Sequence, residues 1–266
     1  MIRFFYSSIF MSILALGISC SNSGGSTTIP CSNNKECTAR NVDTCTNSVC
    51  VCGTDANAKA CKSGEEECLA GVCTKTRLLF STSKTFTLGS AFSTSTATST
   101  IKSAADADAA CNWVADLGGI KGNFAAWIST STASALERIK NKTGSQDVLP
   151  ITNTKAEKVA TTMTNLADSA TVLSVAILNE NSAAATGYVF TGATNSTALG
   201  SSNCNDWSVT TGNDYVGTAG FTTANIWFNN VTGGGAATAL CATAASLYCI
   251  RVDDDAKSYN QDDQQE

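Results

Sequence analysis

The chain of 266 residues contains no histidine, and this absence limits the chemistry that it can perform. Without imidazole, Ser-His-Asp and Cys-His catalysis, zincin motifs and histidine-ligated metal sites are all excluded. Neither glycine-rich phosphate motif, G-x-x-x-x-G-K-[ST] or G-x-G-x-x-G, is present, and the three glycines at 233–235 are typical of a flexible turn. We therefore predict a protein that is not an enzyme and that uses no cofactor.

Concentrated positive charge is also missing. The formal net charge is −5, and the last segment, residues 253–266, carries −5 by itself, so the rest of the chain is balanced. No basic stripe is available to neutralise phosphates, so we expect no nucleic-acid partner. Residues 253–266 themselves have the composition of a solvated, disordered acidic tail.

The chain lacks any apolar run of the roughly 20 residues that a helix needs to span a bilayer. Its longest run, from Phe4 to Ile18, follows the basic residue Arg3 and has the pattern of a secretory signal. The signal ends in LGISC, which resembles the lipobox of bacterial lipoproteins, although Leu16 stands four residues before the cysteine instead of three. We expect residues 1–19 to be a lipoprotein signal peptide and Cys20 to carry the lipid.

The number of cysteines supports lipidation of Cys20. The chain has thirteen cysteines, and removing Cys20 leaves an even set that can pair completely. The alternative is an ordinary signal-peptidase site with Cys20 as a free thiol. Residues 20–30 are polar and Gly/Ser-rich, as expected of a flexible tether. The predicted location is the outer membrane or cell surface, held by the lipid, with the periplasmic face as the other orientation.

Residues 31–76 form a predicted disulfide-rich module. This segment has too few apolar residues for a self-supporting core, so cross-links must stabilise it. Zinc is the rival interpretation, but zinc ribbons favour C-x₂-C pairs, and the segment has none. We expect its cysteines to pair among themselves in a connectivity that the sequence leaves open: Cys31, Cys37, Cys45, Cys50, Cys52, Cys61, Cys68 and Cys73.

Residues 77–252 form the predicted main domain. A helix should begin after the N-cap Ser103 and end at Gly118 or Gly119. Its predicted apolar stripe comprises Ala107, Ala110, Cys111, Val114 and Leu117. Further helices are predicted at 136–142 and 154–168, and strands at 77–88, 124–129, 188–192, 225–229 and 247–252. Cys111 should face the core, and its partner must be distant because the nearest cysteines belong to the other module.

The four cysteines of this domain, Cys111, Cys204, Cys241 and Cys249, accompany a W-I strand and a final cysteine-bearing strand. This arrangement resembles the C-type-lectin-like domain. The segments ADADAAC, AWIS, DVLP, YVFTGATNSTALGSSNCNDW and SLYC are similar, in addition, to a family of spirochaetal lipoprotein domains, some described as endostatin-like. These segments are spread over residues 77–252.

The resemblance implies an α+β fold with two small antiparallel sheets, an early helix and a long loop region before the last strands. It also implies two disulfides, Cys111–Cys249 from the helix to the final strand and Cys204–Cys241 between the inner cysteines, which is the pairing that we predict. Endostatin-like members of the family are regarded as adhesins for host matrix or serum proteins.

Sugar binding through calcium is the first alternative. Calcium-dependent lectins use Glu-Pro-Asn or Gln-Pro-Asp in the long loop and Trp-Asn-Asp on a strand. The chain has prolines only at positions 30 and 150, so no such proline is present. The weak equivalents are Asn179, Glu180, Asn181, Asn229 and Asn230. We interpret them as loop-capping residues and expect no metal. Trp207, Trp227 and Phe228 are expected to fill the core rather than form a binding platform.

The sequence thus predicts a membrane-anchored surface lipoprotein whose head binds host matrix or serum proteins without catalysis. Two alternatives are a carbohydrate-binding module that takes a glycan and a structural envelope lipoprotein without a host ligand.

Overall fold

The computed structural model describes residues 44–46, 49–52, 66–69, 72–93, 100–144, 148–168, 170–223, 227–228 and 238–253. The expected signal peptide, Cys20, the tether and the tail beyond residue 253 lie outside these ranges, as do Cys31, Cys37 and Cys61. No helix in the ranges that are described has both the length and the apolar character to cross a membrane.

Two short hairpins precede the main domain. Strand β1 (Thr44–Thr46) pairs with β2 (Val49–Val51), and β3 (Glu66–Leu69) pairs with β4 (Val72–Lys75), both antiparallel. A disulfide joins Cys52 to Cys68, and Cys73 is also disulfide-bonded. Only Thr76 separates β4 from the first strand of the main domain, so the second hairpin continues directly into the central sheet.

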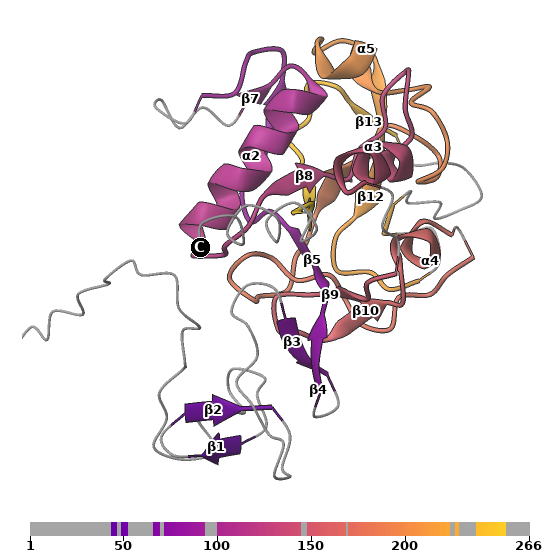
Figure 1. Cartoon of the computed structure of the whole chain (residues 1–266). Helices are drawn as coiled ribbons and strands as arrows, with labels where there is room; N and C mark the ends of the chain where they lie inside the picture. The colour runs from indigo at the N-terminus through magenta and orange to yellow at the C-terminus, as the bar shows by residue number, and fades with distance from the viewer. Residues whose placement is uncertain are drawn as a thin grey trace, which may run out of the picture.

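The main domain is α+β and is built on a five-stranded sheet (Figure 1). The strand order is β10 (Lys158–Ala160), β9 (Ile151–Thr152), β5 (Arg77–Ser81), β14 (Tyr248–Arg251) and β8 (Phe124–Ala126). The first strand of the domain, β5, therefore lies beside the last, β14, and the two are antiparallel. Strands β5 and β9 are parallel, so the expectation of purely antiparallel sheets was wrong. Parallel strands need a long connection, and here the chain passes from β5 to β9 through α2 (Ala104–Leu117), β8 and α3 (Ala135–Lys142).

Both faces of the central sheet are buried, which explains why β5, β8 and β14 are buried at every position. Leu78 and Phe80 of β5 enter the core under α2, whereas Leu79 enters a second core on the opposite face. The second core also holds Trp127, whose indole nitrogen donates to the hydroxyl of Ser196 at 3.0 Å. Trp127 is thus a core residue, with no exposed surface.

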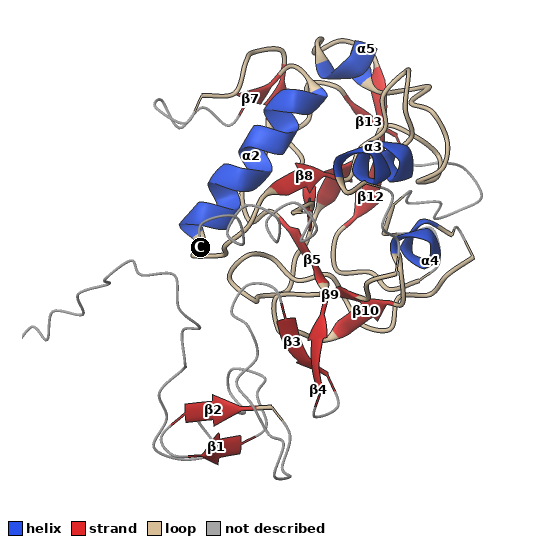
Figure 2. Ribbon diagram, in the orientation of Figure 1, coloured by secondary structure: helices blue, strands red, loops and turns tan. Residues whose placement is uncertain are grey.

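Smaller elements surround the sheet, and most of the remaining chain is loop (Figure 2). A three-stranded antiparallel sheet contains β11 (Tyr188–Phe190), β12 (Asn213–Thr218) and β13 (Thr238–Leu240). Strands β6 (Thr87–Leu88) and β7 (Thr100–Ile101) form a short parallel pair. The short helices are α4 (Met163–Ala167) and α5 (Cys204–Trp207).

Helix α2 begins as the sequence predicts. The Ser103 side chain accepts a hydrogen bond from the Asp106 amide at 3.1 Å, and Gly119 has a positive φ of 69° just beyond the helix. The predicted apolar stripe is correct except at its end, because Leu117 is 58% exposed and Ala115 is buried instead. Leu117 stands at the margin of the stripe, where the helix surface turns away from the core.

Two disulfides close the main domain. Cys111 on α2 is bonded to Cys249 on β14 with an S–S distance of 2.03 Å, and Cys204 is bonded to Cys241 with a distance of 2.01 Å. These are the two pairs that the family resemblance implies. The first ties the early helix to the last strand, and the second ties α5 to the residue that follows β13.

Strand β8 is at the edge of the sheet, yet its outward backbone groups are bonded to side chains. The side-chain amide of Asn112 donates to the carbonyl of Phe124 (2.9 Å) and accepts from its N–H (2.8 Å). The carboxylate of Asp108 accepts from the Ala126 amide (2.8 Å), and Arg138 donates to the Ala126 carbonyl (2.9 Å). Arg138 also forms a two-fold ion pair with Asp108 at 3.1 Å. The side chains of two helices thus replace a neighbouring strand.

One predicted helix is correct only in its last part, and one predicted strand is wrong in the residues that the structure describes. The segment predicted as a helix at 154–168 contains β10 and then α4, which begins after the N-cap Thr162. The segment predicted as a strand at 225–229 has Trp227 and Phe228 in a turn, and its other residues lie outside the described ranges. In the first case pairing with β9 outweighs the helical propensity of a charged, alanine-containing stretch.

The coverage of β8 can be tested with Asp108→Ala. This change removes the ion pair with Arg138 and the bond to the Ala126 amide, so the free energy of unfolding should fall by about 2–4 kcal/mol. The exposed carboxylate of Asp116, on the same helix, provides the control, and Asp116→Ala should change the free energy by less than about 0.5 kcal/mol. Urea unfolding measures both, and equal effects would contradict the role of Asp108.

Candidate functional site

The loop around residue 180 contains three of the weak ligand candidates. Glu180 is 6% exposed, and its carboxylate accepts hydrogen bonds from the amide of Ser83 at 2.8 Å and from the Ser83 hydroxyl. The side-chain oxygen of Asn179 accepts from the amides of Asn181 (3.0 Å) and Ala183 (2.9 Å). The side-chain amide of Asn181 donates to Glu180 at 3.0 Å. These contacts match loop capping rather than a set of metal or sugar ligands.

The other two candidates, Asn229 and Asn230, lie outside the described residues. Among the residues that the structure describes, no three His, Cys, Asp or Glu side chains gather closely enough to hold a metal ion.

The most unusual backbone in the described chain is α5. Its four residues, Cys204–Trp207, have positive φ angles of 53°, 52°, 53° and 73°, although none is glycine. The segment is a left-handed turn, which costs roughly 1–2 kcal/mol per residue for L-amino acids. Strain of this kind persists only where the surroundings enforce it, and it clusters at functional sites.

Asp206 is the polar anchor of this turn. Its carboxylate accepts from the amide of Ser131 (2.7 Å), from the Ser131 hydroxyl and from the side-chain amide of Asn203 (2.6 Å). The Asp206 amide in turn donates to the side chain of Asn203 at 3.1 Å. Burial raises the pKa of Asp206, but the bonds from Ser131 and Asn203 together lower the pKa below its usual value. The carboxylate therefore remains ionised and bonded.

Trp207 is the apolar anchor. It is fully buried, its ring meets Phe190 edge-to-face at 5.6 Å, and its indole nitrogen donates to the carbonyl of Ser129 at 3.2 Å. Gly192 has a φ of 78°, and a side-chain carbon there would lie 2.8 Å from the Trp207 ring. Glycine is thus required where the loop at 191–203 passes over the tryptophan. With the Cys204–Cys241 bond, the turn is held covalently as well as by packing.

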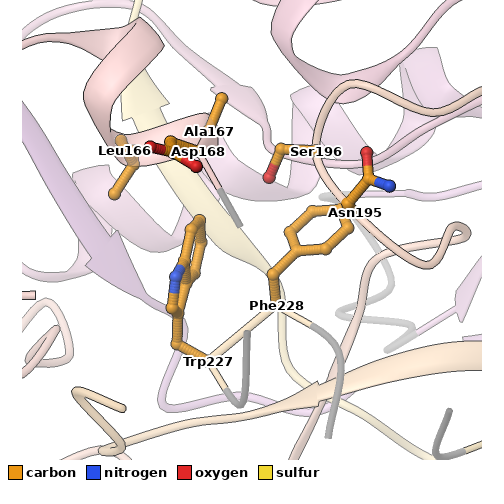
Figure 3. Close-up of a pocket in the computed structure, with 7 residues that line it drawn as sticks. All are labelled: Leu166, Ala167, Asp168, Asn195, Ser196, Trp227 and Phe228. Atoms are coloured by element: carbon orange, nitrogen blue, oxygen red, sulfur yellow. The ribbon is translucent and has the colours of Figure 1, made fainter. Parts of the chain in front are cut away.

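A small pocket lies beside Asn195 and Ser196 of the loop at 191–203, close to α4 (Figure 3). Its lining residues are Leu166, Ala167, Asp168, Asn195, Ser196, Trp227 and Phe228. In Figure 3 the two aromatic rings lie below the other lining residues, Trp227 towards the α4 residues and Phe228 towards Asn195 and Ser196. Each aromatic residue is only 2% exposed, as expected of core residues. The volume of about 10 Å³ is close to the least that holds one water molecule, so the pocket is too small for a sugar ring or a metabolite.

The exposed surface of the loop and the turn is rich in hydroxyl and amide groups. We call its exposed members the loop surface: Thr194, Thr197, Leu199, Ser201, Asn205 and Ser208. Leu199 is its large apolar residue and is 51% exposed. The sequence has no Lys or Arg between Lys158 and Arg251, so no basic side chain from this long segment can contribute to the loop surface.

Sequence reasoning identified Cys204 and Trp207 as framework residues but not the left-handed turn between them. The signal that could have indicated it is the Asn-Asp pair in CNDW, because Asn and Asp tolerate left-handed backbone better than other residues. The role of Ser131 could not be found in this way, since it lies 75 positions from Asp206 in the chain.

No protein-family model matches the chain, and no curated protein matches its sequence at a significant level.

The strain in the turn can be tested at the exposed residue Asn205. The variant Asn205→Val places a β-branched side chain at this position. It should lower the free energy of unfolding by about 1–2 kcal/mol, because a branched side chain is disfavoured at positive φ. Asn205→Gly is the matched control and should keep the stability within about 1 kcal/mol of the wild type. Thermal unfolding of the three proteins makes the comparison. Equal loss in both variants would contradict a left-handed backbone at this position.

Proposed function

We propose that the protein is a lipid-anchored surface lipoprotein whose C-type-lectin-like head binds an extracellular matrix or serum protein without catalysis. The observation that carries this proposal is the loop surface, which is exposed, uncharged at its six positions and supported by a strained turn that Asp206 and Trp207 anchor. The membrane contact is provided by the lipid on Cys20.

The disulfides support an exported protein. Bonds between Cys52 and Cys68, Cys111 and Cys249, and Cys204 and Cys241 form and persist in oxidising compartments and are rare in the cytosol. Export is also what the signal-like sequence before Cys20 predicts. The bond from the early helix to the last strand, together with the pairing of β5 and β14, supports the C-type-lectin-like assignment.

The composition of the loop surface supports protein binding. Hydroxyl and amide side chains on a rigid loop provide adaptable hydrogen bonds, as Ser and Asn do in antibody paratopes. Leu199, near the middle of the segment 194–208 that forms the loop surface, adds an exposed apolar side chain. Anionic ligands such as nucleic acids or sulfated glycans need clustered Lys and Arg, and the segment from 159 to 250 supplies none.

The binding proposal is tested with the mature protein against immobilised matrix proteins, serum proteins and glycans. A matrix or serum protein should bind, and Leu199→Asp should weaken its Kd about tenfold or more, equal to about 1.4 kcal/mol. Leu117→Asp is the matched control, because Leu117 is similarly exposed but lies on α2, and this variant should bind as the wild type does. Biolayer interferometry measures each Kd.

The proposal fails if no protein binds, or if both leucine variants weaken binding equally. Binding to glycans alone would favour the carbohydrate-binding alternative.

Surface location is tested separately by treating intact cells with protease. The head should be cleaved from the cells, while a periplasmic protein used as a marker remains whole. Complete protection of the head on intact cells, with cleavage after the outer membrane is opened, would place the protein at the periplasmic face instead.

A further inference from the structure

Asp214 is a buried acid without the partners that buried acids normally have. It lies on β12 with no exposed surface, and neither carboxylate oxygen makes a hydrogen bond to a described residue. On β12 it shares a face with Val216, and it stands opposite Ala239 of β13. Both neighbours belong to the core under α2, so Asp214 lies on the face of β12 that packs on this core.

Among the residues that the structure describes, no positive charge offsets the burial of Asp214. The elements that contact β12 supply four other ionisable groups: Tyr188 on β11, Tyr215 on β12 itself, Asp206 on α5, and Tyr248 on β14, whose hydroxyl donates to the Thr218 carbonyl at 3.3 Å. Asp206 is already bonded to Ser131, and Tyr215, the next residue on the strand, points to the opposite face. Strand β13 has no ionisable residue, and the sequence from 216 to 247 contains no Asp, Glu, Lys or Arg.

The protonated form of Asp214 is therefore the form that the fold accommodates. Burial raises the pKa of Asp214 well above its usual value, and the backbone amide of Tyr215 offsets only part of this effect. That amide already donates to the carbonyl of Ser202 at 3.0 Å. An ionised carboxylate in an apolar core without a partner is strongly destabilising.

The position of Asp214 connects it to the candidate site. Just before it on the chain, the carbonyl of Gly212 accepts from the amide of Cys241 at 3.0 Å, and Cys241 is bonded to Cys204 of the left-handed turn. Further along β12, Gly217 packs so closely against the backbone of Trp227 that no side chain would fit there. Strand β12 thus supports both the turn and the aromatic lining of the small pocket.

We propose that Asp214 is a pH-sensitive latch between β12 and β13. While its carboxyl group is protonated, the two strands stay paired over the core. When the carboxyl group ionises, the pairing loosens, the charge gains water, and Gly217 of β12 separates from Trp227, while the Cys204–Cys241 bond keeps the end of β13 attached to the left-handed turn. The latch does not depend on which ligand, if any, the loop surface binds.

The direction of the effect follows from the two protonation states. In the opened form Asp214 is solvated and has an ordinary pKa of about 3.9, and in the closed form its pKa is higher. The closed form is therefore fully stable at a pH below the ordinary pKa of Asp214. It loses stability as the pH rises from that value towards the raised pKa of the closed form. Within that window the opening equilibrium constant should increase by up to about tenfold per pH unit.

Amide hydrogen exchange between about pH 4.5 and about pH 8 tests the latch. After correction for intrinsic exchange rates, the protection of the Cys241 amide should fall by up to about tenfold per pH unit in the wild type. It should be independent of pH in Asp214→Asn, which has no carboxyl group to ionise. The Thr82 amide, bonded to the Leu247 carbonyl at 2.8 Å beside the central sheet, is the internal control and should show no such slope.

Asp116→Asn is the matched variant, because it removes an exposed carboxylate and should leave the slope at Cys241 unchanged. A slope that persists in Asp214→Asn, or that is absent in the wild type, would overturn the proposal. If Asp214→Asn does not fold, the proposal is tested in the wild type by the carboxyl carbon-13 chemical shift of Asp214. This shift must titrate at a higher pH than that of an ordinary aspartate, and the protection of the Cys241 amide must fall over the same pH range. A normal titration would likewise overturn it.

Discussion

One face of α2 fastens the helix to the middle of the molecule through three kinds of bond. Asp108, Cys111 and Asn112 stand at positions i, i+3 and i+4, which places them side by side on a helix. Asp108 binds Arg138 and β8, Cys111 forms the disulfide to Cys249, and Asn112 pairs with the backbone of β8. An ion pair, a covalent bond and an amide pair thus fix one helix against two adjacent strands, and the central sheet needs no further strand at that edge.

The candidate site depends on this attachment because the chain that leaves β8 supplies its anchors. The carbonyl of Ser129 receives the indole N–H of Trp207, and Ser131 donates both its amide and its hydroxyl to Asp206. If β8 were free to move, these anchors would move with it, and the left-handed turn would lose the contacts that hold its strain. Because so much of the main domain is loop, many of its backbone polar groups are satisfied by side chains rather than by regular pairing.

The sequence allowed the parts of this fold that rest on local patterns to be predicted. The N-cap Ser103 marked the start of α2 and the run around Cys249 marked the last strand, whereas the α+β class was implied by the family resemblance. The parts that rest on distant contacts were missed or assigned wrongly. The stretch before α4 has helical propensity but pairs with β9, and neither the role of Asp108 nor that of Ser131 is visible without the partner that each meets in space. Asp214 was missed because no strand was predicted at 213–218, and nothing in the local sequence showed that its side chain would be buried.

The central claim is that side chains of α2 and α3 cover the outer edge of β8. Native-state hydrogen exchange at the amides of Phe124 and Ala126 tests it most directly, because these two N–H groups point away from β14 and are bonded only to Asn112 and Asp108. Protection equal to that of the Ile250 amide in the central strand β14 is the predicted result. Rapid exchange at Phe124 and Ala126, as in a solvent-exposed edge strand, with Ile250 still protected, would contradict the account.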